Sequence, residues 1–201
     1  AGVPEQRVHV VGAGVGAVFP AEGPRHEPGF PYLLYIGNHK PHKNLRGPVE
    51  AFASLPRAWG LRLLVSGELD PAVAALARRA GVLDRVVTLG TIAETELPAY
   101  YRGAQLCVSA SLYEGFGLPM LEAMACGIPV VAFAVTAIPE VCGAAALLVP
   151  PPKAGALAAG MRSVLEDTTL RNRLVAAGPL HARRCGWDDV TARVSAVLAA
   201  T

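Results

Sequence analysis

Two glutamates stand eight positions apart in the most informative stretch of the chain, with a glycine-rich turn between them. Glu114 precedes Gly115, Phe116 and Gly117, and Glu122 lies in a stretch that predicts a helix beginning at about Gly117. Glycine lets a backbone approach a ligand closely, and a helix start offers free amides and a partial positive charge. A phosphate held there would have a carboxylate on either side. Carboxylates accept hydrogen bonds from hydroxyl groups, so a sugar–diphosphate–ribose–base ligand fits this order.

Paired carboxylates are also typical of glycoside hydrolysis. The helix start between Glu114 and Glu122 favours an anionic ligand over that reaction, because the amides around Gly117 and Leu118 would meet a phosphate. Glu122 has a plainer interpretation as a solvated helix residue, although its neighbours in the predicted helix are apolar.

A second turn, residues 37–44 (GNHKPHKN), joins a predicted strand to a predicted helix and carries two lysines and two histidines. Lys43, in the first turn of a helix predicted over residues 43–58, could reach a phosphate through a charge-assisted hydrogen bond. The alternative is a solvated loop in which an asparagine caps the helix. The position alone does not decide between the two.

Metal-binding patterns are lacking in the sequence. The two histidines of the second turn have no carboxylate beside them, and the four cysteines are scattered without ligand spacing, so no metal site is expected. Cys107 and Cys126 lie inside apolar runs, where a buried, reduced thiol behaves as a small hydrophobe. The expected compartment is therefore the reducing cytoplasm.

Two kinds of segment alternate along the chain and must position these residues. Short β-branched runs are each followed by an Ala- and Leu-rich amphipathic stretch. This order predicts an α/β, Rossmann-like parallel sheet with helices on both faces, whose ligands bind where the strands end. The predicted strands are near-continuous apolar runs, as in sheets buried on both sides, and cover residues 8–11, 32–36, 61–65, 85–89, 105–109, 129–133 and 146–149. Helices are predicted over residues 43–58, 94–102, 117–125, 154–166, 169–184 and 188–199, and a further helix is predicted to begin at residue 71.

The composition indicates a single globular domain. The 201 residues are 52% apolar and 17% charged, with a net charge of +2, which excludes a disordered chain and argues against a nucleic-acid partner. The length predicts one domain at roughly 150 residues per domain. No apolar run reaches the ~18 residues that a membrane-spanning helix needs, and the start has no secretory signal pattern.

Residues 12–17 (GAGVGA) match the dinucleotide-binding fingerprint after a predicted strand, so an NAD(P)-dependent oxidoreductase is one alternative. That motif needs a helix to begin at once, whereas two prolines and a glycine follow within residues 18–24. A flexible connector is the favoured interpretation.

The stretch over residues 114–131 (EGFGLPMLEAMACGIPVV) resembles the E-x7-E signature of retaining nucleotide-sugar glycosyltransferases of family four, the glycosyl transferases group 1. The likeness covers about residues 30–200, and its other matching positions include Tyr35–Gly37, Pro41, Lys43–Leu45, Leu89–Gly90, Glu96–Leu97, Tyr101, Ile138–Val141, Leu174 and Trp187. The family has the GT-B fold, of which this chain resembles the C-terminal, donor-binding domain. Residues 1–31 would be a connector with the first strand, residues 32–186 the Rossmann-like domain and residues 187–201 a C-terminal helix.

The resemblance implies that Lys43 neutralises the donor diphosphate, that Glu114 holds the hydroxyls of the donor sugar, and that Glu122 binds the ribose. Lys43 and Glu114 would be the catalytic residues of a retaining hexosyl transfer that needs no metal and no cofactor. The backbone of residues 90–92 would read the base. The implied donor-binding residues are Gly37, Asn38, Lys43, Gly90, Thr91, Ile92, Glu114, Gly115, Phe116, Gly117, Leu118 and Glu122.

The resemblance also sets expectations for ligands and partners. Many members carry an arginine where this chain has Asn38, so either His39, Lys40 or the preceding domain compensates, or diphosphate binding is weaker. The form Y-E-G-F-G-L-P over residues 113–119 resembles members that use GDP-mannose, which favours that donor.

An acceptor glycan or lipid would be held by an N-terminal domain, without which transfer is not expected. Peripheral attachment of the whole protein to the inner membrane face and a non-catalytic nucleotide-sugar-binding module stay open as alternatives.

Overall fold

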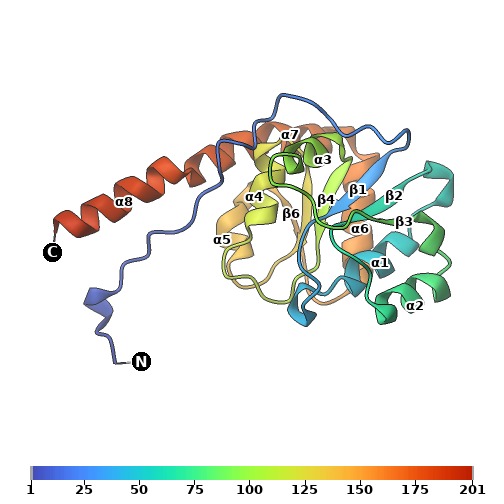
Figure 1. Ribbon diagram of the computed structural model, residues 1–201, viewed down its shortest axis with the longest axis horizontal. Helices are drawn as coiled ribbons and strands as arrows, with labels where there is room; N and C mark the ends of the chain where they lie inside the picture. The colour runs from blue at the N-terminus through green and yellow to red at the C-terminus, as the bar shows by residue number, and fades with distance from the viewer. Residues whose placement is uncertain (1, 201) are drawn as a thin grey trace.

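Six parallel strands form one sheet at the centre of the computed structural model, which describes residues 2–200 (Figure 1). The strands are β1 (Tyr32–Tyr35), β2 (Arg62–Val65), β3 (Val86–Thr88), β4 (Leu106–Ser109), β5 (Val130–Phe133) and β6 (Leu147–Val149). Their order across the sheet is β3-β2-β1-β4-β5-β6. The predicted parallel α/β sheet is confirmed, and the chain switches direction across the sheet between β1 and β4.

Successive strand residues point to opposite faces of the sheet, and helices cover both faces. Leu33 and Tyr35 pack in one hydrophobic cluster with three helices, α1 (Arg46–Ala53), α2 (Pro71–Arg79) and α6 (Ala154–Glu166). Tyr32 and Leu34 pack in a second cluster with α3 (Leu97–Gly103), α4 (Leu118–Ala125) and α5 (Ile138–Cys142). These four side chains of β1 are at most 2% exposed. A further helix, α7 (Thr168–Ala182), packs against α4 and α6.

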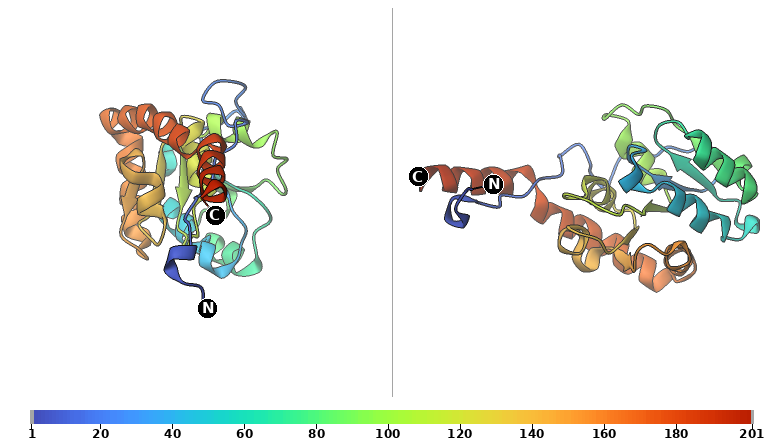
Figure 2. Two further views of the ribbon diagram at one scale, coloured as in Figure 1. Left: turned by 90° about the vertical axis from the view of Figure 1, so that its left-hand side faces the viewer. Right: turned by 90° about the horizontal axis from the view of Figure 1, so that it is seen from below.

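The last helix, α8 (Trp187–Ala199), projects from the body of the molecule on the same side as the first residues of the chain (Figures 1 and 2). A short 3-10 turn, Arg183–Cys185, joins it to α7. The connector meets this turn where Val15 N donates a hydrogen bond to Cys185 O at 2.8 Å. None of the helices within residues 2–200 has the length and apolar character that crossing a membrane requires.

The first predicted strand is wrong. Residues 8–11 form no strand, and Val8 and Val10 are 56% and 88% exposed. Their β-branched side chains fit a strand locally, but this segment lies away from the sheet, where it has no strand to pair with (Figure 1). Residues 2–31 therefore contribute no strand to the sheet.

The helix predicted over residues 43–58 is also displaced. Residues Pro41–Lys43 form a 3-10 turn, and Asn44 follows in the left-handed region with φ 48°. The α-helix begins only at Arg46, so Lys43 lies in the turn ahead of α1 rather than in its first turn. Helix α5 was not predicted, and most other elements begin and end within about two residues of the predicted bounds.

We expect Gly14→Ala to weaken the contact between the connector and the start of α8. A Cβ at Gly14 would lie 2.7 Å from Trp187 N and 2.9 Å from Gly186 C, and these backbone atoms cannot rotate away. Such overpacking typically costs about 1–3 kcal/mol, which would lower the urea midpoint and speed proteolysis of the connector. Gly16→Ala is the matched control, because its Cβ would meet nothing nearer than Val18 Cγ1 at 3.5 Å. Equal stability of the two variants would contradict this packing.

Candidate functional site

The candidate site lies at the carboxyl edge of the sheet, beside the switch point between β1 and β4. The chain leaves β1 toward β2 and leaves β4 toward β5, so the loops after β1 and β4 diverge. Ligands of open α/β sheets bind at such a point. The loop after β1 carries Lys43 and the loop after β4 carries Glu114, so both predicted turns flank it.

Two hydrogen bonds join these loops, one from a side chain to a backbone carbonyl and one between two backbones. Asn44 Nδ2 donates to Ala110 O at 3.0 Å, which is compatible with the left-handed conformation that asparagine tolerates better than most residues. Leu112 N donates to His42 O at 2.7 Å. Lys43, between the two bonded residues, is thereby held over the loop after β4.

The ammonium of Lys43 is paired with the carboxylate of Glu114. Lys43 Nζ lies 2.8 Å from Glu114 Oε1 and 2.9 Å from Oε2. The side chains of Lys43 and Glu114 are 17% and 8% exposed. Both charges have lost most of their hydration, and each is stabilised by the other instead. Ser111 Oγ donates a further hydrogen bond to Glu114 Oε1 at 2.7 Å.

The backbone of Glu114 is clamped by Thr136, which lies after β5. Thr136 Oγ1 accepts a hydrogen bond from Glu114 N at 2.9 Å and donates one to Glu114 O at 2.8 Å. Thr136 itself has φ 43°, a conformation that is strained for a β-branched residue. Three loops, after β1, β4 and β5, therefore converge on the Glu114 position.

Helix α4 begins at Leu118, four positions after Glu114. Its N-cap is Gly117 with φ 102°, and no side chain of the described chain caps its first amides. Those free amides and the helix dipole make the α4 start a site for negative charge. A Cβ at Gly117 would lie 2.5 Å from Ile138 Cδ1, so α5 is packed closely beneath this turn.

Glu122 lies one turn into α4 and has a different partner. Its Oε2 accepts a hydrogen bond of 2.8 Å from the hydroxyl of Tyr101, on α3. Burial raises the pKa of Glu122, the Tyr101 hydrogen bond lowers it, and the like charge of Glu94 raises it further. Glu114 and Glu122 thus share a motif but not an electrostatic environment.

The loops after β1, β2 and β3 are joined along the same edge. Gly37 N donates to Ser66 Oγ at 2.9 Å, and this hydroxyl donates back to Gly37 O at 3.0 Å. Gly67 N donates to Gly90 O at 2.7 Å. The predicted base-reading backbone at residues 90–92 therefore lies two strands away from β1 on one connected edge.

Asn38 and the two side chains named as possible substitutes for the family's arginine, His39 and Lys40, have different surroundings. Asn38 Oδ1 accepts from Lys40 N at 3.3 Å within its own loop. His39 Nε2 lies 2.7 Å from Ser66 O, so this ring supports the loop after β2. Lys40 is exposed at the edge of the site.

The structure brings together Lys43, Glu114 and the start of α4, and it places Glu122 one turn further along α4, against Tyr101. Within residues 2–200, no hydrogen bond joins residues 90–92 to Lys43, Glu114 or the start of α4. Gly115 is exposed, and Phe116 packs partly into the cluster beneath α4. Sequence reasoning missed the roles of Ser66, Tyr101, Ser111 and Thr136. Nothing in the local sequence around Ser66, Ser111 or Thr136 indicates a role at the site. Tyr101 was noted only as one of the positions that match the family.

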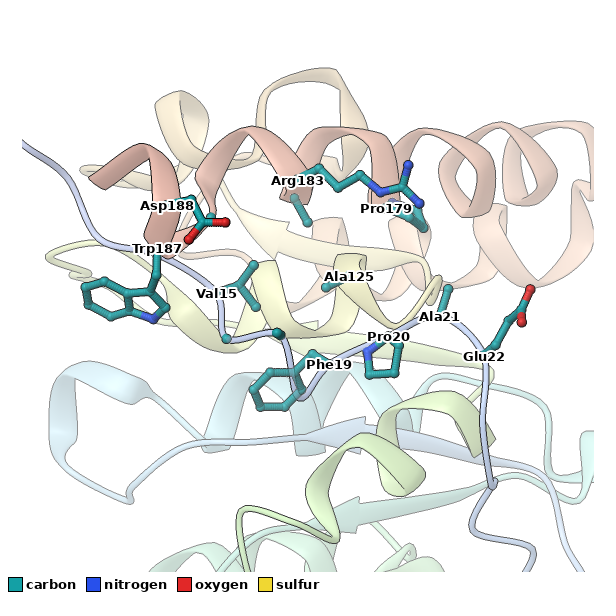
Figure 3. A pocket seen from close by; sticks show the side chains of 14 residues that line it. Val15, Phe19, Pro20, Ala21, Glu22, Ala125, Pro179, Arg183, Trp187 and Asp188 are labelled. Carbon is teal, nitrogen blue, oxygen red and sulfur yellow. The ribbon is translucent and has the colours of Figure 1, made fainter. Parts of the chain in front are cut away.

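A pocket of about 520 Å³ lies elsewhere, between the connector and the junction of α7 and α8 (Figure 3). Phe19 and Pro20 line it from the connector, and Pro179, Arg183 and Trp187 line it from the helices. It includes none of the predicted donor-binding residues. We therefore take the carboxyl edge of the sheet, where the charged groups converge, as the functional site.

The dinucleotide-binding fingerprint of the sequence has no counterpart in the structure. Residues 12–17 lead into a turn and an irregular segment instead of a helix, so the amides that a dinucleotide-binding motif requires are not arranged. Within residues 2–200, His, Cys, Asp and Glu side chains form no group of three that could hold a metal ion.

Comparison with known proteins agrees with this geometry. The family described as glycosyl transferases group 1 matches residues 21–181. The chain is 38% identical over 165 residues to O-antigen chain mannosyltransferase B of Escherichia coli, covering 80% of this chain and 43% of that relative. Among solved structures, sucrose-phosphate synthase from Thermosynechococcus elongatus has a TM-score of 0.83 at 29% identity, over 96% of this chain and 53% of that one. Anabaena HepE in complex with UDP-glucose shares the fold, with a TM-score of 0.78 at 21% identity over 86% and 50% of the two chains. The chain thus spans about half the length of these relatives.

We expect Lys43→Met to lower the free energy of unfolding by about 3 kcal/mol, because it leaves the buried Glu114 carboxylate without its cation. The double variant with Glu114→Gln should recover most of this loss, since a neutral amide costs less to bury. Urea denaturation at neutral pH measures both.

The matched control is Arg162→Met, which removes an exposed ion pair to Glu166, whose side chains are 43% and 53% exposed. An exposed pair contributes about 0–1 kcal/mol. If Lys43→Met and Arg162→Met cost the same, the pair at the site has no structural role.

Proposed function

Because the chain belongs to the glycosyl transferases group 1 family, we propose that it is the donor-binding domain of a glycosyltransferase whose donor is a nucleotide-diphosphate sugar. Its relatives are about twice as long. The acceptor, a glycan or lipid, would bind to the preceding domain of the whole protein, and transfer would require that domain.

The observation that carries this proposal is the position of Lys43. Its ammonium is held against Glu114, which lies four positions ahead of Leu118, the uncapped start of α4. A diphosphate at that start would meet the Lys43 charge and the amides around Gly117 and Leu118 together. The arrangement supports a diphosphate ligand better than a sugar alone, since neutral hydroxyls do not need a cation and a helix start.

The two glutamates then take the two ends of the donor. Glu114, ahead of the glycines, is proposed to accept hydrogen bonds from the transferred sugar. Glu122, one turn inside α4, is proposed to accept hydrogen bonds from the ribose. The loop at residues 90–92 would contact the base, and Gly37 and Asn38 would complete the phosphate side.

The chemistry that we propose is retaining transfer without a metal or cofactor. Negative charge develops on the diphosphate as its bond to the sugar breaks. We propose that Lys43 and the α4 amides meet that charge, which would supply the preorganised electrostatic stabilisation that lowers reaction barriers.

GDP-mannose is the donor that we propose, on the resemblance of residues 113–119 and on the name of the Escherichia coli relative, a mannosyltransferase. The proposed compartment is the cytoplasm, which the free state of Cys107, Cys126, Cys142 and Cys185 supports.

The test is calorimetry of the chain with GDP, UDP, ADP and CDP. We expect tight binding of one nucleoside diphosphate, and Lys43→Ala should weaken it roughly ten- to hundred-fold, because a charge-assisted contact contributes about 1.5–3 kcal/mol. Arg46→Ala is the control, since it removes the same charge from the exposed face of α1, where Arg46 pairs with Glu50. Unchanged affinity of Lys43→Ala would make Lys43 a structural residue and contradict the diphosphate site.

A second test separates the glutamates by ligand. Glu122→Gln should weaken GDP and GDP-mannose alike, because both contain the ribose. Glu114→Gln should weaken GDP-mannose but not GDP, because it removes a partner of the sugar and leaves Lys43 to the phosphates. Each lost hydrogen bond to a carboxylate should contribute about 1.5–3 kcal/mol. If both variants show one pattern in calorimetry, the carboxylates do not bind opposite ends of the donor.

A further inference from the structure

Tyr101 has a hydrogen-bond partner that its burial alone does not explain. Its side chain is 0% exposed, and a buried phenol needs an acceptor. Tyr32, 1% exposed on the same face of the sheet, meets this need with a backbone carbonyl, because its hydroxyl donates to Tyr100 O at 2.7 Å. Tyr101 instead donates to the ionisable Glu122 at 2.8 Å, a carboxylate that costs free energy to bury.

The hydrogen bond holds one carboxylate oxygen of Glu122 and leaves acceptor capacity on the other. The ionisable groups that face Glu122 are Tyr101 from α3, Glu94 from the loop before α3, and the thiols of Cys107 and Cys126. Burial raises the pKa of Cys126 to about 12 and that of Cys107 higher still, so both thiols are neutral. Tyr101 is therefore the neighbour that favours the ionised form of Glu122, against burial and Glu94.

The connector fixes Tyr101 from its other side. Phe19, 6% exposed, meets the Tyr101 ring edge-on with 6.0 Å between ring centroids. The next residue, Arg102, donates to Pro24 O at 2.7 Å and to Pro20 O at 3.0 Å. The end of α3 is thus held to residues 19–24 by a ring contact and two charged hydrogen bonds, and its phenol reaches Glu122 from that support.

We infer that Tyr101 is a positioning residue for the donor: its hydroxyl orients the Glu122 carboxylate toward the ribose, and Phe19 of the connector holds Tyr101 in place. This inference rests on the proposed function, because it takes the ribose as the partner of Glu122. It adds that nucleotide affinity depends on a residue that touches no part of the ligand, and on the connector that leads into the domain.

The test compares Tyr101→Phe with the unaltered chain, using GDP and its 2′,3′-dideoxy analogue in calorimetry across the acid and neutral range. We expect the variant to bind GDP about 3–10-fold more weakly, as for one lost hydrogen bond, and to bind the dideoxy analogue unchanged. The ionised Glu122 accepts from the ribose, so affinity is lost as the pH falls through its pKa. Without the phenol that pKa rises, and the loss for GDP should begin at a higher pH. The analogue carries the same phosphates and corrects for their own titration.

Tyr100→Phe is the matched control, since it removes a hydroxyl one residue earlier in α3, from a ring that stacks on His26. Phe19→Leu keeps the phenol and should weaken GDP in the same direction but less. It also serves as the second variant if Tyr101→Phe does not fold. Because Phe19 acts through Tyr101, the effects of the two changes should not add.

An equal loss for GDP and its analogue, with an unmoved pH profile, would make Tyr101 a purely structural residue and overturn the inference. So would a Phe19→Leu variant whose GDP affinity is unchanged, or one whose loss of affinity adds in full to that of Tyr101→Phe. If the unaltered chain binds none of the four nucleoside diphosphates, the proposed function fails and this inference fails with it, and that outcome is distinct from the first two.

Discussion

The pairing of Lys43 with Glu114 joins two opposite charges that are largely withdrawn from water, and the surrounding loops depend on it. A buried carboxylate without a cation would cost several kcal/mol, so the loops after β1 and β4 must hold these two groups together. The hydrogen bonds from Asn44 Nδ2 to Ala110 O and from Leu112 N to His42 O do so. Thr136 adds a third loop at the cost of a strained φ. Local strain of this kind persists where neighbouring contacts over-determine it, and such places are often functional.

The two glutamates show how one motif yields two chemical environments. Glu114 faces a cation and a hydroxyl, and Glu122, one turn into α4, faces a phenol and a distant like charge. The first is paired with the ammonium of Lys43. Burial raises the pKa of the second, and a single neutral donor, the Tyr101 hydroxyl, opposes that shift. That difference favours separate roles for the two carboxylates at the ends of one ligand.

The strands and helices were largely predictable because their signals are local. Apolar runs such as residues 61–65 and 129–133 predict strands that are buried on both faces. Asp70 caps the helix that begins at Pro71 by accepting hydrogen bonds from the backbone amides of its first turn. Residues 8–11 have the same local preference, yet they are exposed and unpaired, since strand formation needs a neighbouring strand that the local sequence does not supply. The start of α1 was misplaced because the left-handed Asn44 that delays it is stabilised by Ala110, which is distant in sequence.

By itself, the sequence determined the fold class, the glycine-rich start of α4 and the spacing that puts Glu122 one turn behind it, because these follow from backbone preference and helix period. The sequence also singled out Lys43 and Glu114, because each is a charged residue in a turn that follows a predicted strand. Only the tertiary structure decided that these two side chains meet, that Ser111 and Thr136 hold Glu114, and that Tyr101 rather than solvent faces Glu122. Lys43 and Glu114 are 71 positions apart. They become neighbours because β1 and β4 pair in the middle of the sheet, and that strand order is settled by the packing of the whole domain and not by any local segment.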